Sequence, residues 1–127
     1  MPCTVGDVYR AGVALLFEEA YDDRDFSDNA PALISHLVAE ALPYENAHRV
    51  SRGEEKLGSA PVYRGMEDEI CLTDCICRVA LPLGLAAYYW QDEGNDYRAQ
   101  DFRARFIDAL KGAVPAQEDR IEDEYGY

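Results

Sequence analysis

Positive charge is the scarcest property of this chain of 127 residues. Its 12 lysines and arginines stand against 25 aspartates and glutamates, which leaves a formal net charge of −13. Proteins that wrap nucleic acid or lie on an anionic membrane need basic side chains to neutralise phosphate. The composition therefore argues against direct nucleic-acid binding and against a membrane as partner.

Uninterrupted apolar runs are also missing. The least charged stretch, 72–90, approaches the roughly 20 residues that a membrane span requires, but Asp74, Arg78 and Pro82 interrupt it. The first ten residues lack the basic region and apolar core of a secretory signal. We therefore expect a cytosolic product in which the four cysteines are reduced.

Patterns that carry catalysis are absent from the sequence. It has no phosphate-binding glycine loop, no nucleophile elbow and no calcium loop. Its only histidines are His36 and His48, and neither has a cysteine or a second histidine at helical spacing. His36 and Glu40 could form a proton-transfer pair, although an exposed pair on one helix face is the favoured interpretation. We expect no enzymatic activity and no cofactor.

Three cysteines in seven residues, Cys71, Cys75 and Cys77, raise the question of a metal site. On a helix, Cys71 and Cys75 share a face while Cys77 lies roughly 160° around it, so three thiolates cannot meet one tetrahedral ion. We expect buried free thiols and no metal.

Helical periodicity predicts an all-α fold of four principal helices over about 4–20, 30–42, 72–91 and 96–111. The third is apolar on both faces, so it should be the buried centre, kinked at Pro82. Thr4 and Asp7 form a capping signal for the first helix. Pro43 should end or bend the second. The aromatic run Tyr88-Tyr89-Trp90 is either core or a stacking platform for bases, and core is favoured.

Between the second and third helices, 44–70 has little periodicity, although 44–51 could hold a short helix. A loop of this length is either functional or ordered by a partner. The division is then a helical domain over 1–112 and an acidic, flexible tail over 113–127. Candidate partner contacts lie in the loop and the tail: Tyr44, Arg49, Arg52, Tyr63, Arg64, Tyr125 and Tyr127.

Four segments together resemble a known class of protein. They are the acidic helix entry MEDEICLTD at 66–74, ALPLGLAA at 80–87, the Asp-rich turn 92–96 and FRARFIDAL at 102–110. The chain is similar in these segments to small phage and prophage head–tail connector, or head-completion, proteins. The resemblance covers 66–112 and departs at the cysteine-rich helix start and the acidic tail.

The resemblance implies a helical structural adaptor that forms a homo-oligomeric ring between portal and tail-side adaptor. It would be found in the bacterial cytoplasm, encoded by a prophage, or in the virion. An acidic ring lumen would let DNA pass without binding it. The alternative from another class is a small acidic regulator or inhibitor that binds a basic protein, possibly as a nucleic-acid mimic. An enzyme is the third possibility.

Overall fold

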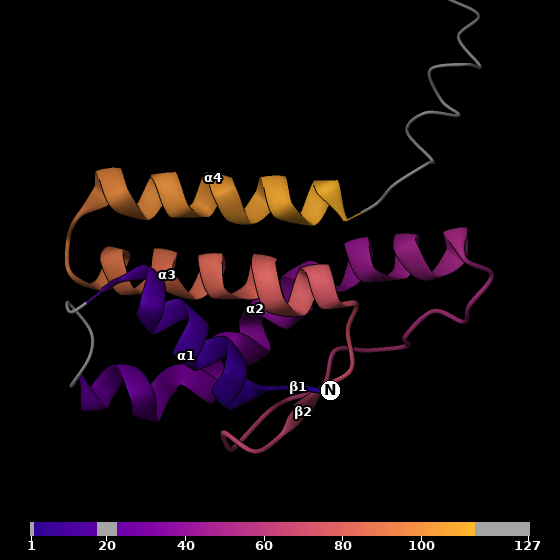
Figure 1. Ribbon diagram of the computed structural model, residues 1–127, viewed down its shortest axis with the longest axis horizontal. Coiled ribbons are helices and arrows are strands. Elements are labelled where there is room, and N and C mark those ends of the chain that lie inside the picture. Colours follow the sequence, from indigo (N-terminus) through magenta and orange to yellow (C-terminus); the bar gives the residue numbers. More distant parts are fainter. Residues whose placement is uncertain (1, 18–22, 114–127) are drawn as a thin grey trace, which may run out of the picture.

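The computed structural model describes residues 2–17 and 23–113, and it confirms a mainly helical fold. A central helix, α3 (Leu81–Asp92), has α4 (Asp96–Gly112) on one side and α1 (Val5–Leu15) and α2 (Arg24–Ser51) on the other (Figure 1). Two short strands, β1 (Cys3–Thr4) and β2 (Glu69–Ile70), pair antiparallel, with Cys3 opposite Ile70. Among the described residues, no helix combines the length and apolar character needed to cross a membrane.

Helix α1 begins with the predicted capping box. The backbone N–H of Asp7 donates to the Thr4 hydroxyl at 3.1 Å, and the backbone N–H of Thr4 donates to the Asp7 carboxylate at 3.0 Å. The helix ends at Leu15, earlier than predicted, and Phe17 two residues later has a positive φ of 57°. The rest of the predicted helix, 18–20, lies outside the described residues.

Helix α2 is much longer than the predicted 30–42. It starts at Arg24, where the Asp23 carboxylate caps the helix by accepting from the Phe26 N–H, and it continues through Pro43 to Ser51. An internal proline disfavours a helix by about 3 kcal/mol. Here a helically spaced stripe offsets that cost, because its members are fully buried: Ala30, Ile34, Leu37, Val38 and Ala41.

The predicted irregular loop 44–70 is therefore shorter, because 44–51 belongs to α2. The remainder lies against α2 and is fixed by it. The Asn46 side chain exchanges two hydrogen bonds with the backbone of Leu57, at 2.7 and 3.1 Å. The Ser35 hydroxyl accepts from the Tyr63 N–H at 2.7 Å. These bonds order the loop within the chain itself.

The predicted third helix, 72–91, is two segments. A π-helical segment, Cys75–Ala80, precedes α3, and the N–H of Leu81 donates to the Ile76 carbonyl five residues back. Pro82, at the start of α3, has no N–H to donate. The wider turn thus ends directly before the proline, where the sequence predicts a kink.

The core surrounds α3, as predicted. Side chains from every helix contribute, including Val8, Leu37, Leu85, Phe106 and Leu110. Gly84 sits where α2, α3 and α4 come closest: a Cβ added there would lie 2.6 Å from Leu37 and 3.0 Å from Phe106. Helix α4 matches its predicted range to within one residue and is capped by Asn95.

Candidate functional site

The predicted contact residues fall into different environments. Arg52 and Arg64 are exposed, whereas Tyr63 is only 6 % exposed and lies in the core. Tyr44 packs partly buried against the core. Tyr125 and Tyr127 lie outside the described residues. Of the predicted contact residues within 2–17 and 23–113, the two arginines Arg52 and Arg64 are exposed and the side chain of Tyr63 is buried.

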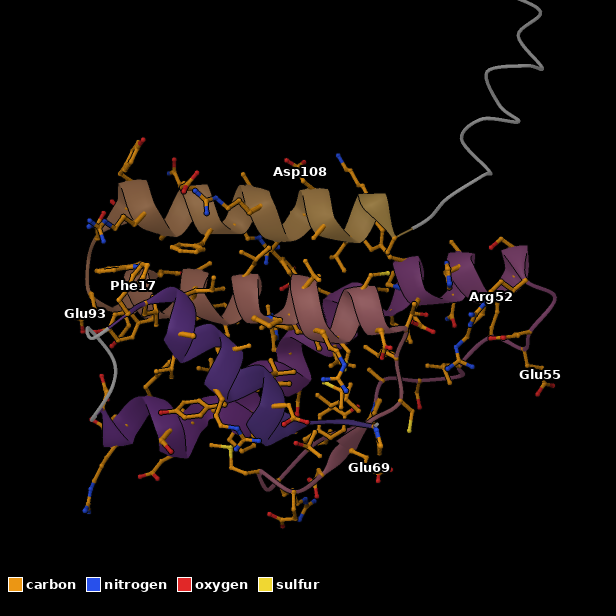
Figure 2. All side chains as sticks on the ribbon, viewed as in Figure 1. Phe17, Arg52, Glu55, Glu69, Glu93 and Asp108 are labelled. Atoms are coloured by element: carbon orange, nitrogen blue, oxygen red, sulfur yellow. The ribbon has the colours of Figure 1, made fainter. Side chains whose placement is uncertain are left out.

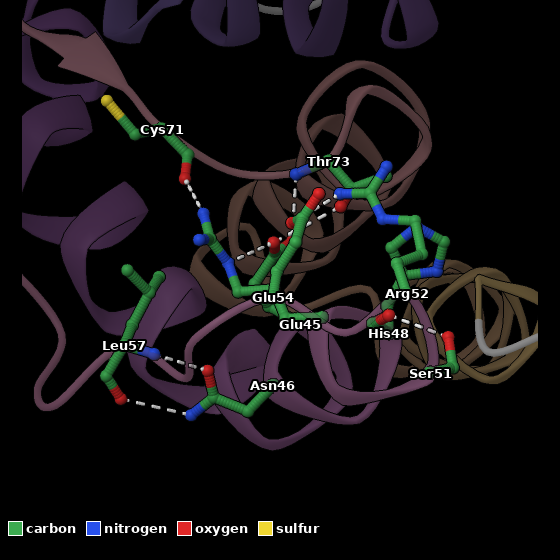
Figure 3. A network of polar contacts seen from close by, with 10 residues as sticks. Glu45, Asn46, His48, Ser51, Arg52, Glu54, Leu57, Cys71 and Thr73 are labelled. Atoms are coloured by element: carbon green, nitrogen blue, oxygen red, sulfur yellow. Dashed lines mark hydrogen bonds and ion pairs between the residues drawn. The ribbon is translucent and has the colours of Figure 1, made fainter.

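Arg49 turns inward, because a buried carboxylate engages it. Glu45 is 1 % exposed and accepts from Arg49 Nε at 2.8 Å, from the Thr73 N–H at 2.8 Å and from the Thr73 hydroxyl at 3.2 Å. Arg49 also donates to the Cys71 carbonyl at 3.2 Å. Figure 3 shows Glu45, Thr73 and Cys71 meeting where the loop enters the π-helical segment. Such a fully partnered buried carboxylate fixes the loop to α2.

A groove on the opposite part of α2 is the best candidate for binding. Two hollows of about 460 and 820 Å³ meet at Tyr88 and Gln91 of α3. Seven residues of α2 line them, and most lie three or four positions from the next, as one helix face requires: Asp25, Phe26, Asn29, Ala32, Leu33, His36 and Glu40. We call the two hollows together the α3 groove.

Helices α3 and α4 supply the rest of its lining. Small residues form part of the floor, which Gly84, Ala87 and Ala99 line. Around them are polar side chains that can donate or accept hydrogen bonds: Gln91, Asp96, Gln100 and Arg103. The groove therefore combines an apolar floor with a polar rim, as ligand-binding surfaces do.

The smaller hollow of the α3 groove holds a cluster of four polar side chains. Arg103 binds both carboxylate oxygens of Glu40, one of them at 3.0 Å, and so bridges α4 to α2. The Tyr88 hydroxyl lies 3.4 Å from the same carboxylate, and His36 Nε2 lies 3.8 Å from it. The hydrogen bond from Arg103 lowers the pKa of Glu40. Burial, followed by the Glu40 charge, raises the pKa of Tyr88.

This chemistry suits binding better than proton transfer. A general base needs a pKa near neutral pH, whereas the hydrogen bond from Arg103 lowers the pKa of Glu40 further below that range. His36 lies on the rim with a side chain 66 % exposed. Within 2–17 and 23–113, no three His, Cys, Asp or Glu side chains come together in a way that could hold a metal ion.

One end of the α3 groove, which we call the acidic end, is formed by Asp23, Asp25, Asp92 and Glu93. Its floor is aromatic and aliphatic, with Phe26, Leu33, Tyr88 and Tyr89. Phe26 packs edge-on against Tyr89 with ring centroids 5.2 Å apart. The predicted preference of Tyr88-Tyr89-Trp90 for the core holds for Tyr89 and Trp90, which are buried, whereas Tyr88 reaches the groove.

The sequence predicts that Cys71, Cys75 and Cys77 are buried, and this prediction is wrong for two of them. Cys3 and Cys77 are buried, but Cys71 and Cys75 are exposed, because Cys71 precedes the helix and Cys75 faces outward from its first turn. All four are free thiols.

Sequence reasoning missed the α3 groove because it began the second helix only at about residue 30. With 24–29 placed in the helix, Asp25 and Asn29, four residues apart, fall on the same face as His36 and Glu40, which are also four apart and begin seven residues after Asn29. The signal that could have found it is the Asp23 cap followed by this spacing.

Comparison with protein-family models, with curated proteins and with solved structures gives no match for this chain.

Proposed function

We propose that this protein is a structural adaptor of the head–tail connector kind, which acts by binding other proteins and not by catalysis. The observation that carries the proposal is the α3 groove, an acidic and aromatic surface open at one end of the long helix α2. A helix of 28 residues extends about 42 Å, so the two ends of α2 can face two different neighbours.

The other end of α2 has a different surface. Val50 is 47 % exposed there, next to the exposed Arg52, and Val62 in the adjoining loop is 73 % exposed. Figure 2 shows Arg52 and Glu55 at one end of the molecule and Glu93, of the acidic end, at the other. Exposed apolar side chains beside mixed charges are typical of contact surfaces. Two dissimilar surfaces joined by one rigid helix suit an adaptor.

The net charge fits the same role. At −13, copies of the chain repel one another in solution, so a ring would form on a partner that holds them in place. The acidic surface of such a ring would also repel DNA that passes through it. The similarity of 66–112 to head–tail connector proteins supports this version of an adaptor over others.

Deletion of the gene tests the proposal in a phage or inducible prophage that carries it. We expect full heads and separate tails to accumulate, visible by electron microscopy, and a plasmid-borne copy to restore joined particles. Joined, infectious particles in the deletion strain would overturn the proposal.

The acidic regulator remains the second candidate, because the α3 groove suits a basic partner equally well. The same deletion separates the two. A regulator would leave particle assembly intact and change the activity of a basic nuclease or repressor encoded beside it.

A further inference from the structure

We infer that the α3 groove binds a lysine- or arginine-bearing segment of a partner protein, with a cationic side chain seated at the acidic end against Tyr88. This rests on the proposed function, in that it names the chemistry of the partner that the adaptor would bind. It assigns recognition to residues that lie far from the arginines of the 44–70 region.

The shape of the groove fits a chain segment. Asp25 and Glu40 are 15 residues apart in α2, which corresponds to a length of about 22 Å along the helix axis. An extended peptide of about seven residues spans that distance. The two hollows meet at Tyr88 and Gln91, so one segment can occupy both.

The charge of the acidic end fits a cation. In the part of the chain that the structure describes, no ion pair joins Asp25, Asp92 or Glu93 to a basic side chain. Asp92 is also the last residue of α3, where the helix dipole places partial negative charge. The electrostatic potentials of these carboxylates therefore add up to a negative potential at the acidic end of the groove.

The floor fits the rest of a lysine or arginine side chain. Leu33 and the ring of Tyr88 offer apolar surface to an aliphatic stem, and a ring face attracts the charged head. The molecule already contains such contacts: the Arg98 guanidinium lies 4.7 Å from the Trp90 ring centre, and Arg103 lies 5.2 Å from that of Phe106.

Charge complementarity selects a foreign segment over a second copy of this chain. Two copies each carry −13 and repel, whereas a basic partner is attracted and oriented by the same field. Apolar packing alone would not make that distinction.

The test is a titration of the ¹⁵N-labelled full chain with hexalysine amide, followed by two-dimensional NMR, with hexaglutamate as the matched probe. We expect hexalysine to shift the amides of Asn29, Leu33, Tyr88 and Gln91, and hexaglutamate to shift none. Shifts spread evenly over the acidic surface would overturn the inference.

Two triple variants separate the groove from general acidity. The groove variant is D25N/D92N/E93Q, and its matched control is E55Q/E69Q/D108N, which removes three exposed carboxylates away from the groove (Figure 2). The loss of three exposed charge contacts predicts an affinity for hexalysine about tenfold weaker in the groove variant. The control variant should change the affinity for hexalysine less than about threefold. Equal weakening by the two triple variants would contradict the inference.

Substitutions of Tyr88 provide an independent test of the aromatic contact. Y88F keeps the aromatic face and should bind hexalysine within about twofold of the native chain, whereas Y88L should bind several-fold more weakly. Melting curves show whether either variant is folded. Equal affinities for folded Y88F and Y88L would remove the aromatic contact from the inference.

The outcomes also separate this inference from the adaptor proposal. Separate heads and tails in the deletion strain, together with no hexalysine binding, would leave the adaptor and reject the groove. Hexalysine binding in the groove, together with normal particles in the deletion strain, would keep the groove inference and reject the adaptor.

Discussion

At the scale of single residues, two carboxylates hold together parts of the chain that are distant in sequence. Glu45 ties α2 to the entry of the π-helical segment through Arg49 and Thr73. Glu40 ties α2 to α4 through Arg103. Both lie on the same helix, and both are accompanied by partners that satisfy their charge.

Replacing Glu45 by Gln should destabilise the fold. The Arg49 guanidinium loses its anion, and the amide nitrogen that replaces one oxygen can face a donor of Thr73. We expect a loss of about 2–4 kcal/mol in the free energy of unfolding, measured in urea. The control is E54Q, which breaks only the exposed pair with Arg52 and should change stability by less than about 1 kcal/mol. Equal effects of the two substitutions would contradict the role given to Glu45.

The Glu40–Arg103 pair should make stability depend on pH at the acidic end of the range. The hydrogen bond from Arg103 lowers the pKa of Glu40 below its ordinary value of 4.5, so the folded state binds that proton more weakly than the unfolded state. The contribution is complete above pH 4.5 and is lost as the pH falls through the lowered folded pKa.

The melting temperatures of the native chain and of E40Q, measured from neutral pH downward, test this. Their difference should be largest at neutral pH and should shrink below pH 4.5. Because other carboxylates titrate in the same range, the comparison is made against E55Q, whose exposed side chain should give a small difference at every pH. A constant difference for E40Q would contradict the assignment.

At the scale of elements, α3 sets the positions of the other helices, and Gly84 is the point of closest approach. Leu37 of α2 and Phe106 of α4 both reach the space that a side chain at this position would occupy. Gly84 also lines the floor of the α3 groove, so the shape of that floor depends on the packing of α2 and α4 against Gly84.

Replacing Gly84 by Ala should therefore destabilise the fold, despite the higher helix propensity of alanine. The new Cβ would lie 2.6 Å from Cδ2 of the fully buried Leu37, and overpacking of this kind costs about 1–3 kcal/mol. The matched control is G112A near the end of α4, where a Cβ meets nothing within 4 Å and should be neutral or stabilising by up to about 1 kcal/mol. Urea unfolding of both variants measures the contrast, and a neutral G84A would contradict the packing described.

The elements also show what sequence patterns could and could not predict. The cap at Thr4, the range of α4 and the central position of α3 follow from local spacing, and the structure confirms them. The extent of α2 does not follow, because Pro43 disfavours a helix locally and only tertiary burial of the stripe offsets its cost.

The α2 face of the α3 groove could have been predicted from the Asp23 cap and the spacing that follows it, but the complete groove could not, for a related reason. It needs three helices in register, and it joins Asp25 to Asp92, which are 67 positions apart in the sequence. The loop after α2 is a second case. Its low periodicity indicated a loop that is either functional or ordered by a partner, and the structure shows that Asn46 and Ser35 of the chain itself fix it.

At the scale of the whole molecule, charge and shape point to the same role. A net charge of −13 keeps copies apart, while the acidic end and the Val50–Arg52 end of α2 offer unlike surfaces to unlike neighbours. We interpret the protein as one that gains its quaternary structure from a partner.

The measurement that tests this most directly is native mass by light scattering over a concentration series, alone and with the portal-type protein of a phage or prophage that carries the gene. The account predicts a monomer of 14.3 kDa at every concentration when alone, and a multi-copy assembly when the portal-type protein is added. A mass that the portal-type protein leaves unchanged would contradict it.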